Sequence, residues 1–144
     1  MTVKLSWTAV LFALLALVSG CSNSPTSASS TPGHTQTDIR TGGGTDAAVG
    51  NAVTVEYTGW LWDPTKPDQK GLQFDTSRNS TTAFTFTLGA GQVIKGFDEG
   101  TVGMRVGGLR RLVIPPQLGY GDVRTGSIPP NSTLVFDIEL ISIQ

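Results

Sequence analysis

Residues 91–100 read Gly91-Gln92-Val93-Ile94-Lys95-Gly96-Phe97-Asp98-Glu99-Gly100. This stretch turns a strand-like apolar run into a short helix, which we expect over residues 95–102. At the turn it presents Val93, Ile94 and Phe97 together. Three apolar side chains gathered at such a turn predict the lining of a small apolar pocket.

The sequence on both sides of this turn has the period of β-strands. Val53, Val55 and Tyr57 alternate with polar residues, and a second alternating run extends from residue 134 to residue 141. Period two is typical of half-buried strands. Residues 83–88 and 109–114 are also strand-like, whereas residues 60–73 and 115–132 are rich in turn formers and are expected to be loops. The pattern predicts an α+β fold, in which an antiparallel sheet is covered on one face by one short helix.

The N-terminal residues have the features of an export signal. Lys4 precedes an uncharged apolar run over residues 5–18, which is too short for a confident transmembrane helix. The run ends in Val18-Ser19-Gly20-Cys21, which resembles the lipobox of bacterial lipoproteins. The resemblance implies removal of residues 1–20 and a lipid on Cys21, which is the only cysteine in the chain. The alternative is an ordinary secretory signal followed by a chance cysteine.

Residues 21–49 are dominated by Ser, Thr, Gly and Pro and contain few aliphatic side chains. Such a segment cannot bury enough apolar surface to offset the entropy of ordering. We therefore expect a disordered tether of about 28 residues, with a root-mean-square span of about 30 Å. His34, the only histidine, would be solvated within this tether.

Several classes of chemistry are disfavoured by composition. The only histidine and the only cysteine lie outside the expected domain, so a Ser-His-Asp or Cys-His site is excluded there. No pair of thiols or imidazoles suggests a metal site, and no phosphate-binding glycine pattern follows a strand, so neither metal nor cofactor is expected. Ten basic and eleven acidic residues give no basic face for a nucleic acid.

Six further motifs lie before and after residues 91–100 along the chain. They are Tyr57-Thr58-Gly59, Phe74-Asp75-Thr76-Ser77-Arg78, Phe84-Thr85-Phe86, Leu118-Gly119-Tyr120-Gly121, Ile128-Pro129-Pro130 and Leu134-Val135-Phe136-Asp137. In this order and spacing, residues 50–144 resemble the FK506-binding-protein (FKBP) type of peptidyl-prolyl cis-trans isomerase. The resemblance implies a curved sheet of five or six strands wrapped around one short helix. It also implies proline-containing polypeptides as substrates and macrolides such as FK506 or rapamycin as ligands.

The same resemblance implies roles for individual residues. Phe97 would form the floor of the proline pocket, and Tyr120 would donate its hydroxyl to a substrate carbonyl. Asp75 would lie beside the twisting amide, where it would either accept a hydrogen bond from Tyr57 or polarise the site. The Ile94 backbone N–H would bind a second carbonyl. The walls would be Tyr57, Phe74, Phe84, Val93, Ile94, Ile128 and Phe136. Taken one at a time, Phe74, Phe86 and Phe136 are better explained as core residues, whereas the whole set in family order favours a pocket.

Two positions depart from the best-known relatives, which carry tryptophan at the position of Phe97 and often arginine at that of Ser80. An apolar floor tolerates phenylalanine. Without the arginine, Asp75 either lacks a cationic partner or takes Arg78.

These observations favour a lipid-anchored prolyl isomerase on the extracytoplasmic side of a bacterial cell envelope, acting on exported proteins. Catalysis would come from desolvation and stabilisation of the twisted amide in an aromatic pocket. The alternative is a prolyl-peptide-binding module or holdase with little isomerase activity, for which Trp60 and Trp62 are the candidate client surface. A weaker alternative is a lipoprotein β-domain used only for adhesion.

Overall fold

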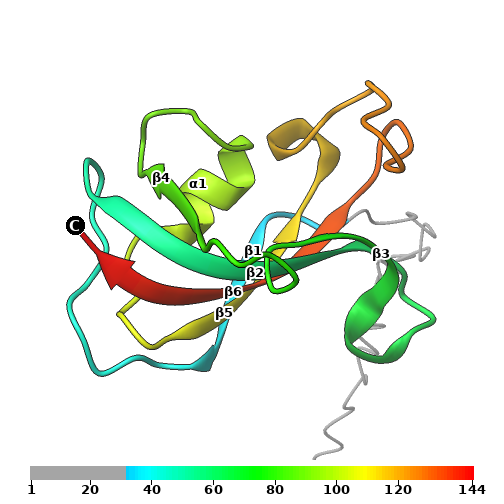
Figure 1. The fold of residues 1–144 in the computed structure, drawn as a ribbon. Coiled ribbons are helices and arrows are strands. Elements are labelled where there is room, and N and C mark those ends of the chain that lie inside the picture. Colours follow the sequence, from blue (N-terminus) through cyan, green and yellow to red (C-terminus); the bar gives the residue numbers. More distant parts are fainter. Residues whose placement is uncertain (1–31) are drawn as a thin grey trace, which may run out of the picture.

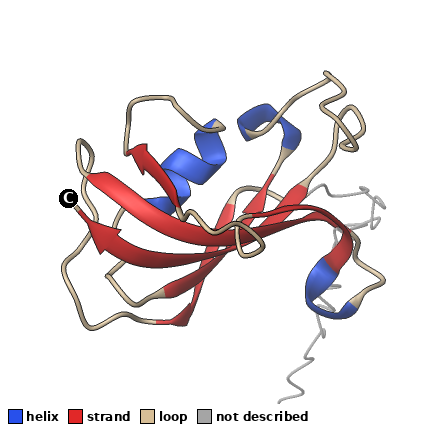
Figure 2. Cartoon of the chain, viewed as in Figure 1, coloured by secondary structure: helices blue, strands red, loops and turns tan. Residues whose placement is uncertain are grey.

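A computed structural model describes residues 32–144 and shows a curved antiparallel sheet with one helix lying across one face (Figure 1). The strands are β1 (Thr35–Arg40), β2 (Ala52–Trp62), β3 (Lys70–Thr76), β4 (Phe84–Thr87), β5 (Leu109–Ile114) and β6 (Leu134–Ile143), and the α-helix is α1 (Lys95–Thr101). Short 3₁₀ helices lie at Pro67–Gln69 (η1) and Pro116–Leu118 (η2). The α+β class and the six-stranded curved sheet confirm the predicted fold (Figure 2).

Strand order in the sheet is β1-β5-β6-β2-β3, and β4 pairs with the first half of β2. Strand β2 therefore changes partner along its length, from β4 at Ala52–Val55 to β3 from Thr58 onward. This change leaves the middle of β2, at Tyr57, between the ends of β3 and β4. The inward residues of β2 and β6 alternate as the period-two pattern predicts, and Val53, Val55, Ile138 and Leu140 are fully buried.

Two glycines allow α1 to pack closely against β5. A Cβ at Gly96 would lie 2.5 Å from Ile114, and one at Gly100 would lie 2.4 Å from Leu112. A helix of seven residues with two glycines is too short to be stable alone, so tertiary contacts must hold it. Arg110 supplies one such contact, because its Nη1 donates to the carbonyls of Gly100 and Val102 at 3.0 Å.

The expected tether over residues 21–49 is wrong for the described part of that range. Residues 35–40 form β1, which pairs with β5, and Ala47 is buried. All six side chains of β1 are exposed, so the strand gave no hydrophobic signal. It forms because the edge of β5 offers unpaired backbone groups and because Asp38 pairs with Arg110 at 2.6 Å, a hydrogen bond that lowers the pKa of Asp38.

The expected loop over residues 60–73 is also wrong at both of its ends. Strand β2 continues to Trp62 and β3 begins at Lys70, so the connection is confined to residues 63–69. The Lys70 ammonium lies 4.2 Å from the centre of the Trp60 ring, and Trp62 Nε1 donates to Gln69 Oε1 at 3.3 Å. Both tryptophans are thus engaged within the hairpin, which disfavours them as an added client surface.

The predicted signal peptide over residues 1–20 and the predicted lipid on Cys21 lie outside the described residues. Within residues 32–144, no helix is long and apolar enough to cross a membrane. In the same range, no three His, Cys, Asp or Glu side chains are grouped so that they could hold a metal ion.

Ion pairs tie the strands together on the face of the sheet opposite α1. Asp137 of β6 accepts hydrogen bonds from Lys70 at 2.6 Å and from Arg111 at 2.8 and 3.1 Å. Burial alone would raise the pKa of Asp137, but these hydrogen bonds and the two positive charges outweigh burial and lower it. The carboxylate therefore stabilises the fold only while it is ionised.

Acid should remove this contribution. The folded-state pKa of Asp137 lies below its unfolded value of about 3.9, so its stabilisation is fully present above that pH and is lost as pH falls through the folded pKa. Asp137→Asn should lower the free energy of unfolding by about 1–3 kcal/mol at pH 7 and make stability less dependent on pH below about 4. Urea unfolding of both proteins between pH 2 and pH 7 measures this, and parallel curves would contradict it.

Candidate functional site

A pocket of about 210 Å³ lies between α1 and the concave face of the sheet. Its lining comes from β2, β3, β4, the turn between β4 and α1, α1 itself, the segment after η2, and β6. The lining residues are Tyr57, Phe74, Asp75, Phe84, Gln92, Val93, Ile94, Phe97, Tyr120 and Phe136. Six of these side chains are aromatic, so the cavity favours an apolar, ring-shaped group.

Phe97 occupies the centre of the aromatic cluster and is only 4% exposed. Its ring meets those of Tyr57, Phe86 and Phe136 edge to face, with centroids 5.6, 5.7 and 5.2 Å away. Edge-to-face pairs hold rings at fixed angles. Phe84 closes one side against Tyr57, and Phe74 closes the other against Phe136.

Gly59 shapes the cavity although it does not line it. A Cβ at this position would lie 2.7 Å from both Phe136 and Phe74. The absence of a side chain on β2 therefore lets these two rings meet across the sheet. The role of Gly59 could have been predicted from the sequence, because this glycine follows Tyr57 by two residues and therefore lies on the same face of the strand.

The polar groups of the site lie at the pocket edge. The Tyr57 hydroxyl donates to Asp75 Oδ2 at 2.7 Å, as expected. Burial, followed by the bond to Asp75, raises the pKa of Tyr57, and burial with the nearby Asp75 charge raises that of Tyr120. Both phenols therefore keep their protons at neutral pH and can act as hydrogen-bond donors.

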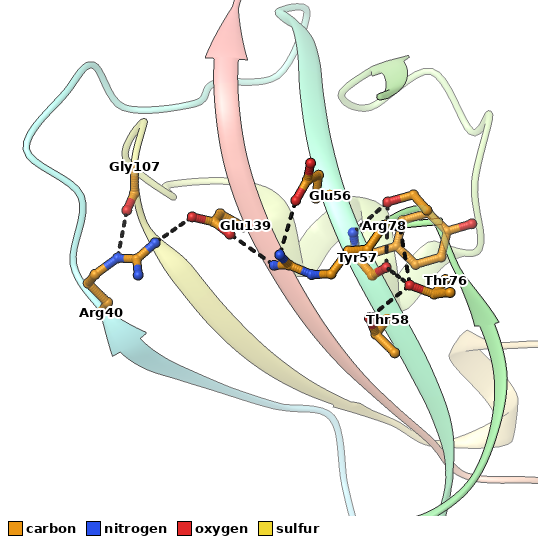
Figure 3. A network of polar contacts seen from close by, with 9 residues as sticks. Arg40, Glu56, Tyr57, Thr58, Thr76, Arg78, Gly107 and Glu139 are labelled. Carbon is orange, nitrogen blue, oxygen red and sulfur yellow. Dashed lines mark hydrogen bonds and ion pairs between the residues drawn. The ribbon is translucent and has the colours of Figure 1, made fainter. Parts of the chain in front are cut away.

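The turn after β3 holds Asp75 in place. Ser77 N donates to the Tyr57 carbonyl at 3.0 Å, and Tyr57 N donates to Ser77 Oγ at 2.8 Å, so this turn is bonded to β2 from both sides. Arg78 does not pair with Asp75. Its guanidinium points to the outer face and lies 3.0 Å from Glu56 and 2.9 Å from Glu139 (Figure 3). The suggestion that Arg78 replaces the missing arginine is therefore wrong.

This geometry agrees with comparison to known proteins. A family model described as FKBP-type peptidyl-prolyl cis-trans isomerase matches residues 43–141. The chain belongs to this family.

Curated relatives support the same assignment. The chain is 46% identical over 107 residues to an FK506-binding protein of Neisseria meningitidis serogroup B, covering 74% of this chain and 92% of the relative. It is 44% identical over 108 residues to FK506-binding protein 1 of Aspergillus oryzae, with coverage of 73% and 93%.

A solved structure shows the same fold. The crystal structure of FkpA from Escherichia coli aligns with a TM-score of 0.66 at 38% identity, over 78% of this chain. The match spans 48% of the FkpA chain, about half of its length.

The structure of this FKBP-type domain brings nearly all expected site residues to one cavity. Ile128 is the exception, because it is buried in the core and is not among the lining residues. Gln92 was not anticipated: it lines the pocket while its Oε1 accepts a bond from Thr87 N at 2.7 Å. The feature of the sequence that could have identified Gln92 is its position within residues 91–100, directly before Val93.

Asp98 supports the wall of the FKBP pocket from behind. Its buried carboxylate accepts hydrogen bonds from Gly89 N at 2.7 Å and Gly91 N at 3.3 Å. Both glycines have positive φ, at 79° and 67°, so the turn that leads to Val93 needs residues without side chains there. Asp98 thereby fixes the backbone that delivers Val93 and Ile94 to the cavity.

Proposed function

We propose that this FKBP-type isomerase acts on X-Pro bonds of exported polypeptides and holds the proline ring against Phe97. The observation that carries this proposal is the aromatic cavity closed by Phe97, with the Tyr57–Asp75 pair and Tyr120 at its edge. Within residues 32–144, the cavity lining contains no Ser, Thr, Cys, Lys or His side chain, and prolyl isomerisation needs no covalent nucleophile.

The reaction barrier is electronic. Twisting the X-Pro amide removes its partial double bond, at a cost of about 18–20 kcal/mol, and the uncatalysed exchange takes tens to hundreds of seconds. The planar amide is more polar than the twisted one. A dry aromatic cavity therefore disfavours the ground state more than the transition state. A barrier lower by about 5–6 kcal/mol corresponds to roughly 10⁴-fold in rate.

The polar residues would orient the peptide. Tyr120, at the cavity rim and protonated at neutral pH, would donate to a carbonyl of the substrate. The Ile94 N–H, at the start of α1, would bind a second carbonyl and so fix the chain on both sides of the twisting bond. Asp75, already bonded to Tyr57, would place its negative charge beside that bond.

A protease-coupled assay tests this function directly. The full-length protein in detergent should accelerate cis-trans exchange in an X-Pro tetrapeptide, and FK506 should inhibit it, since we also propose that the cavity binds such macrolides. Binding of FK506 without acceleration would favour a peptide-binding module. Neither acceleration nor binding would overturn the proposal.

Replacing the polar groups should weaken activity without abolishing it. Tyr120→Phe and Asp75→Ala should each lower kcat/KM by roughly threefold to thirtyfold, because each removes one hydrogen-bonding or polarising group worth about 0.5–2 kcal/mol. The aromatic cavity remains in both variants. The tetrapeptide assay measures the change, and a loss beyond about a thousandfold in a folded variant would indicate acid–base or covalent chemistry instead.

We further propose that the protein is a bacterial lipoprotein that faces the extracytoplasmic side. The support is the sequence of residues 1–21, with an apolar run that ends in Val18-Ser19-Gly20-Cys21. Exported polypeptides would then be its substrates, because they fold in the same compartment.

Metabolic labelling tests the anchor. An alkyne fatty acid should label the wild-type protein, whereas Cys21→Ser should stay unlabelled and keep residues 1–20. An unlabelled wild type, or a mature N-terminus at another residue, would indicate a free exported enzyme with an ordinary secretory signal.

A further inference from the structure

Val49 is a large apolar residue that the fold leaves 69% exposed. It lies in the tight turn Ala48–Asn51, in which Asn51 N donates to the Ala48 carbonyl at 3.0 Å. Surface valines are common when they are scattered singly. Val49 differs because a groove lies beside it, and because the backbone on both sides of it is held in place.

The flanking bonds attach this turn to the elements that build the pocket. Gly50 N donates to the Leu88 carbonyl, and Gly103 N donates to the Ala47 carbonyl, each at 2.8 Å. The turn therefore bridges the end of β4 and the end of α1. In Figure 1 it leads into β2 at the same end of the sheet as the loop from β4 to α1. Val49 is thus presented on a fixed backbone.

A groove of about 420 Å³ lies between Val49 and α1. Its apolar surface comes from Val49, Val93 and Val102. Its floor is formed by Gly89 and Gly91, which have no side chains to fill the groove. Val49 already lies against the Gly89 backbone, where a Cβ would be 2.6 Å from Val49 Cγ1. The floor is rigid, since the buried Asp98 carboxylate binds both glycine amides.

The charges at the rim of the groove balance each other. Lys95 and Glu99 line it and pair with one another at 3.7 Å, one turn apart on α1. Asp98 directs its carboxylate at the glycine amides. The groove therefore offers a largely aliphatic surface between these charged groups, which suits an uncharged apolar side chain.

The groove and the proline pocket adjoin at Val93, which lines both cavities. An extended peptide advances about 3.3 Å per residue, so a side chain about two or three residues from the proline can pass over Val93 and reach Val49. A second protein copy is a poorer occupant, since a stable protein interface buries about 1,200 Å² or more and this groove accommodates only one or two side chains.

We propose that this groove, centred on Val49, is a second substrate subsite that takes an aliphatic or aromatic side chain of the same polypeptide whose proline occupies the Phe97 pocket. The proposal rests on the proposed function of that pocket. It makes the enzyme selective for proline sites that have an apolar residue nearby, as occurs in unfolded segments of a hydrophobic core.

A leucine scan tests the subsite. Peptides of about ten residues, with one Ala-Pro bond and otherwise Ser and Gly, would carry a single leucine at each position in turn. With the full-length protein, leucine at one position about two or three residues from the proline should raise kcat/KM about threefold to tenfold over serine, as expected for burying part of that side chain. The Gly89 and Gly91 amide resonances should shift only with that peptide.

Matched variants assign the effect to the groove. Val49→Ser should abolish most of the leucine advantage and Val49→Ile should keep it. Leu72→Ser, which alters a similarly exposed residue (66%) on β3, should leave it unchanged. All three variants should isomerise a tetrapeptide without an apolar side chain at that position at the wild-type rate, because such a substrate gains nothing from the groove.

The outcomes separate the subsite from the function itself. If the tetrapeptide is isomerised but leucine gives no advantage, or if the advantage survives Val49→Ser, the subsite is wrong while the isomerase stands. If no peptide is isomerised, the proposed function fails, and the amide shifts still decide whether leucine binds at the groove. A Val49→Ser variant that changes only the oligomeric state would assign the groove to a second copy and overturn the proposal.

Discussion

Phe97→Ala is expected to lower kcat/KM on the X-Pro tetrapeptide by about a hundredfold, which corresponds to about 2.7 kcal/mol of lost transition-state stabilisation. The ring contacts three other aromatic rings and forms the closed end of the cavity. Alanine would leave the proline ring without a floor and would admit water, which removes the desolvation on which the proposed mechanism depends.

The same change should lower the free energy of unfolding by about 3 kcal/mol, the lower end of the range for a buried phenylalanine, because one side of the ring borders the cavity. Urea unfolding and circular dichroism separate lost stability from lost chemistry. Phe97→Leu provides the control, since an apolar floor remains and activity should stay within about tenfold of the wild type. A folded Phe97→Ala enzyme with full activity would show that Phe97 is not the pocket floor.

Asp98→Ala is expected to lower the free energy of unfolding by about 2–3 kcal/mol. The Asp98 side chain is buried, and its loss leaves the Gly89 and Gly91 amides without their acceptor. Since these amides fix the turn before Val93, kcat/KM on the tetrapeptide should also fall by about tenfold, mainly through a higher KM. Urea unfolding and the tetrapeptide assay measure the two effects.

The neighbouring residue provides a matched control. Glu99 is on the same helix, but its side chain is half exposed and pairs only with Lys95. Glu99→Ala should therefore change stability by less than about 0.5 kcal/mol. Hydrogen exchange of the Gly89 and Gly91 amides should accelerate in Asp98→Ala and not in Glu99→Ala. Equal exchange in both variants would show that Asp98 does not hold this turn.

The chain alone was sufficient for the α+β class, for four of the strands and for α1. These elements can be recognised in the sequence because each must bury one face. The apolar residues of each strand or helix therefore recur with the period of that element, as in Val53-Thr54-Val55. Most of the aromatic cavity could be predicted for a related reason. Its residues fall within motifs such as Tyr57-Thr58-Gly59, which resemble those of the family.

Features that depend on a distant partner could not be predicted in this way. Strand β1 has no buried side chain. It forms because its backbone pairs with the edge of β5 and because Arg110 binds the Asp38 side chain. Strand β2 continues beyond Trp60 because it pairs there with β6, where Trp60 lies opposite Val135 and Leu61 opposite Leu134. Arg78 turns away from Asp75 because Glu56 and Glu139, from two other strands, lie on the outer face.

The amino-acid sequence by itself determined four of the six described strands, the helix, and which aromatic residues are available for a pocket. Only the tertiary structure decided that Ile128 is excluded from the pocket lining and that Gln92 joins it. It also decided that Val49 lies beside the wall of the site. The physical reason is the distance along the chain between interacting residues. Periodicity indicates which face of an element is buried, whereas these placements depend on contacts between segments that are far apart along the chain.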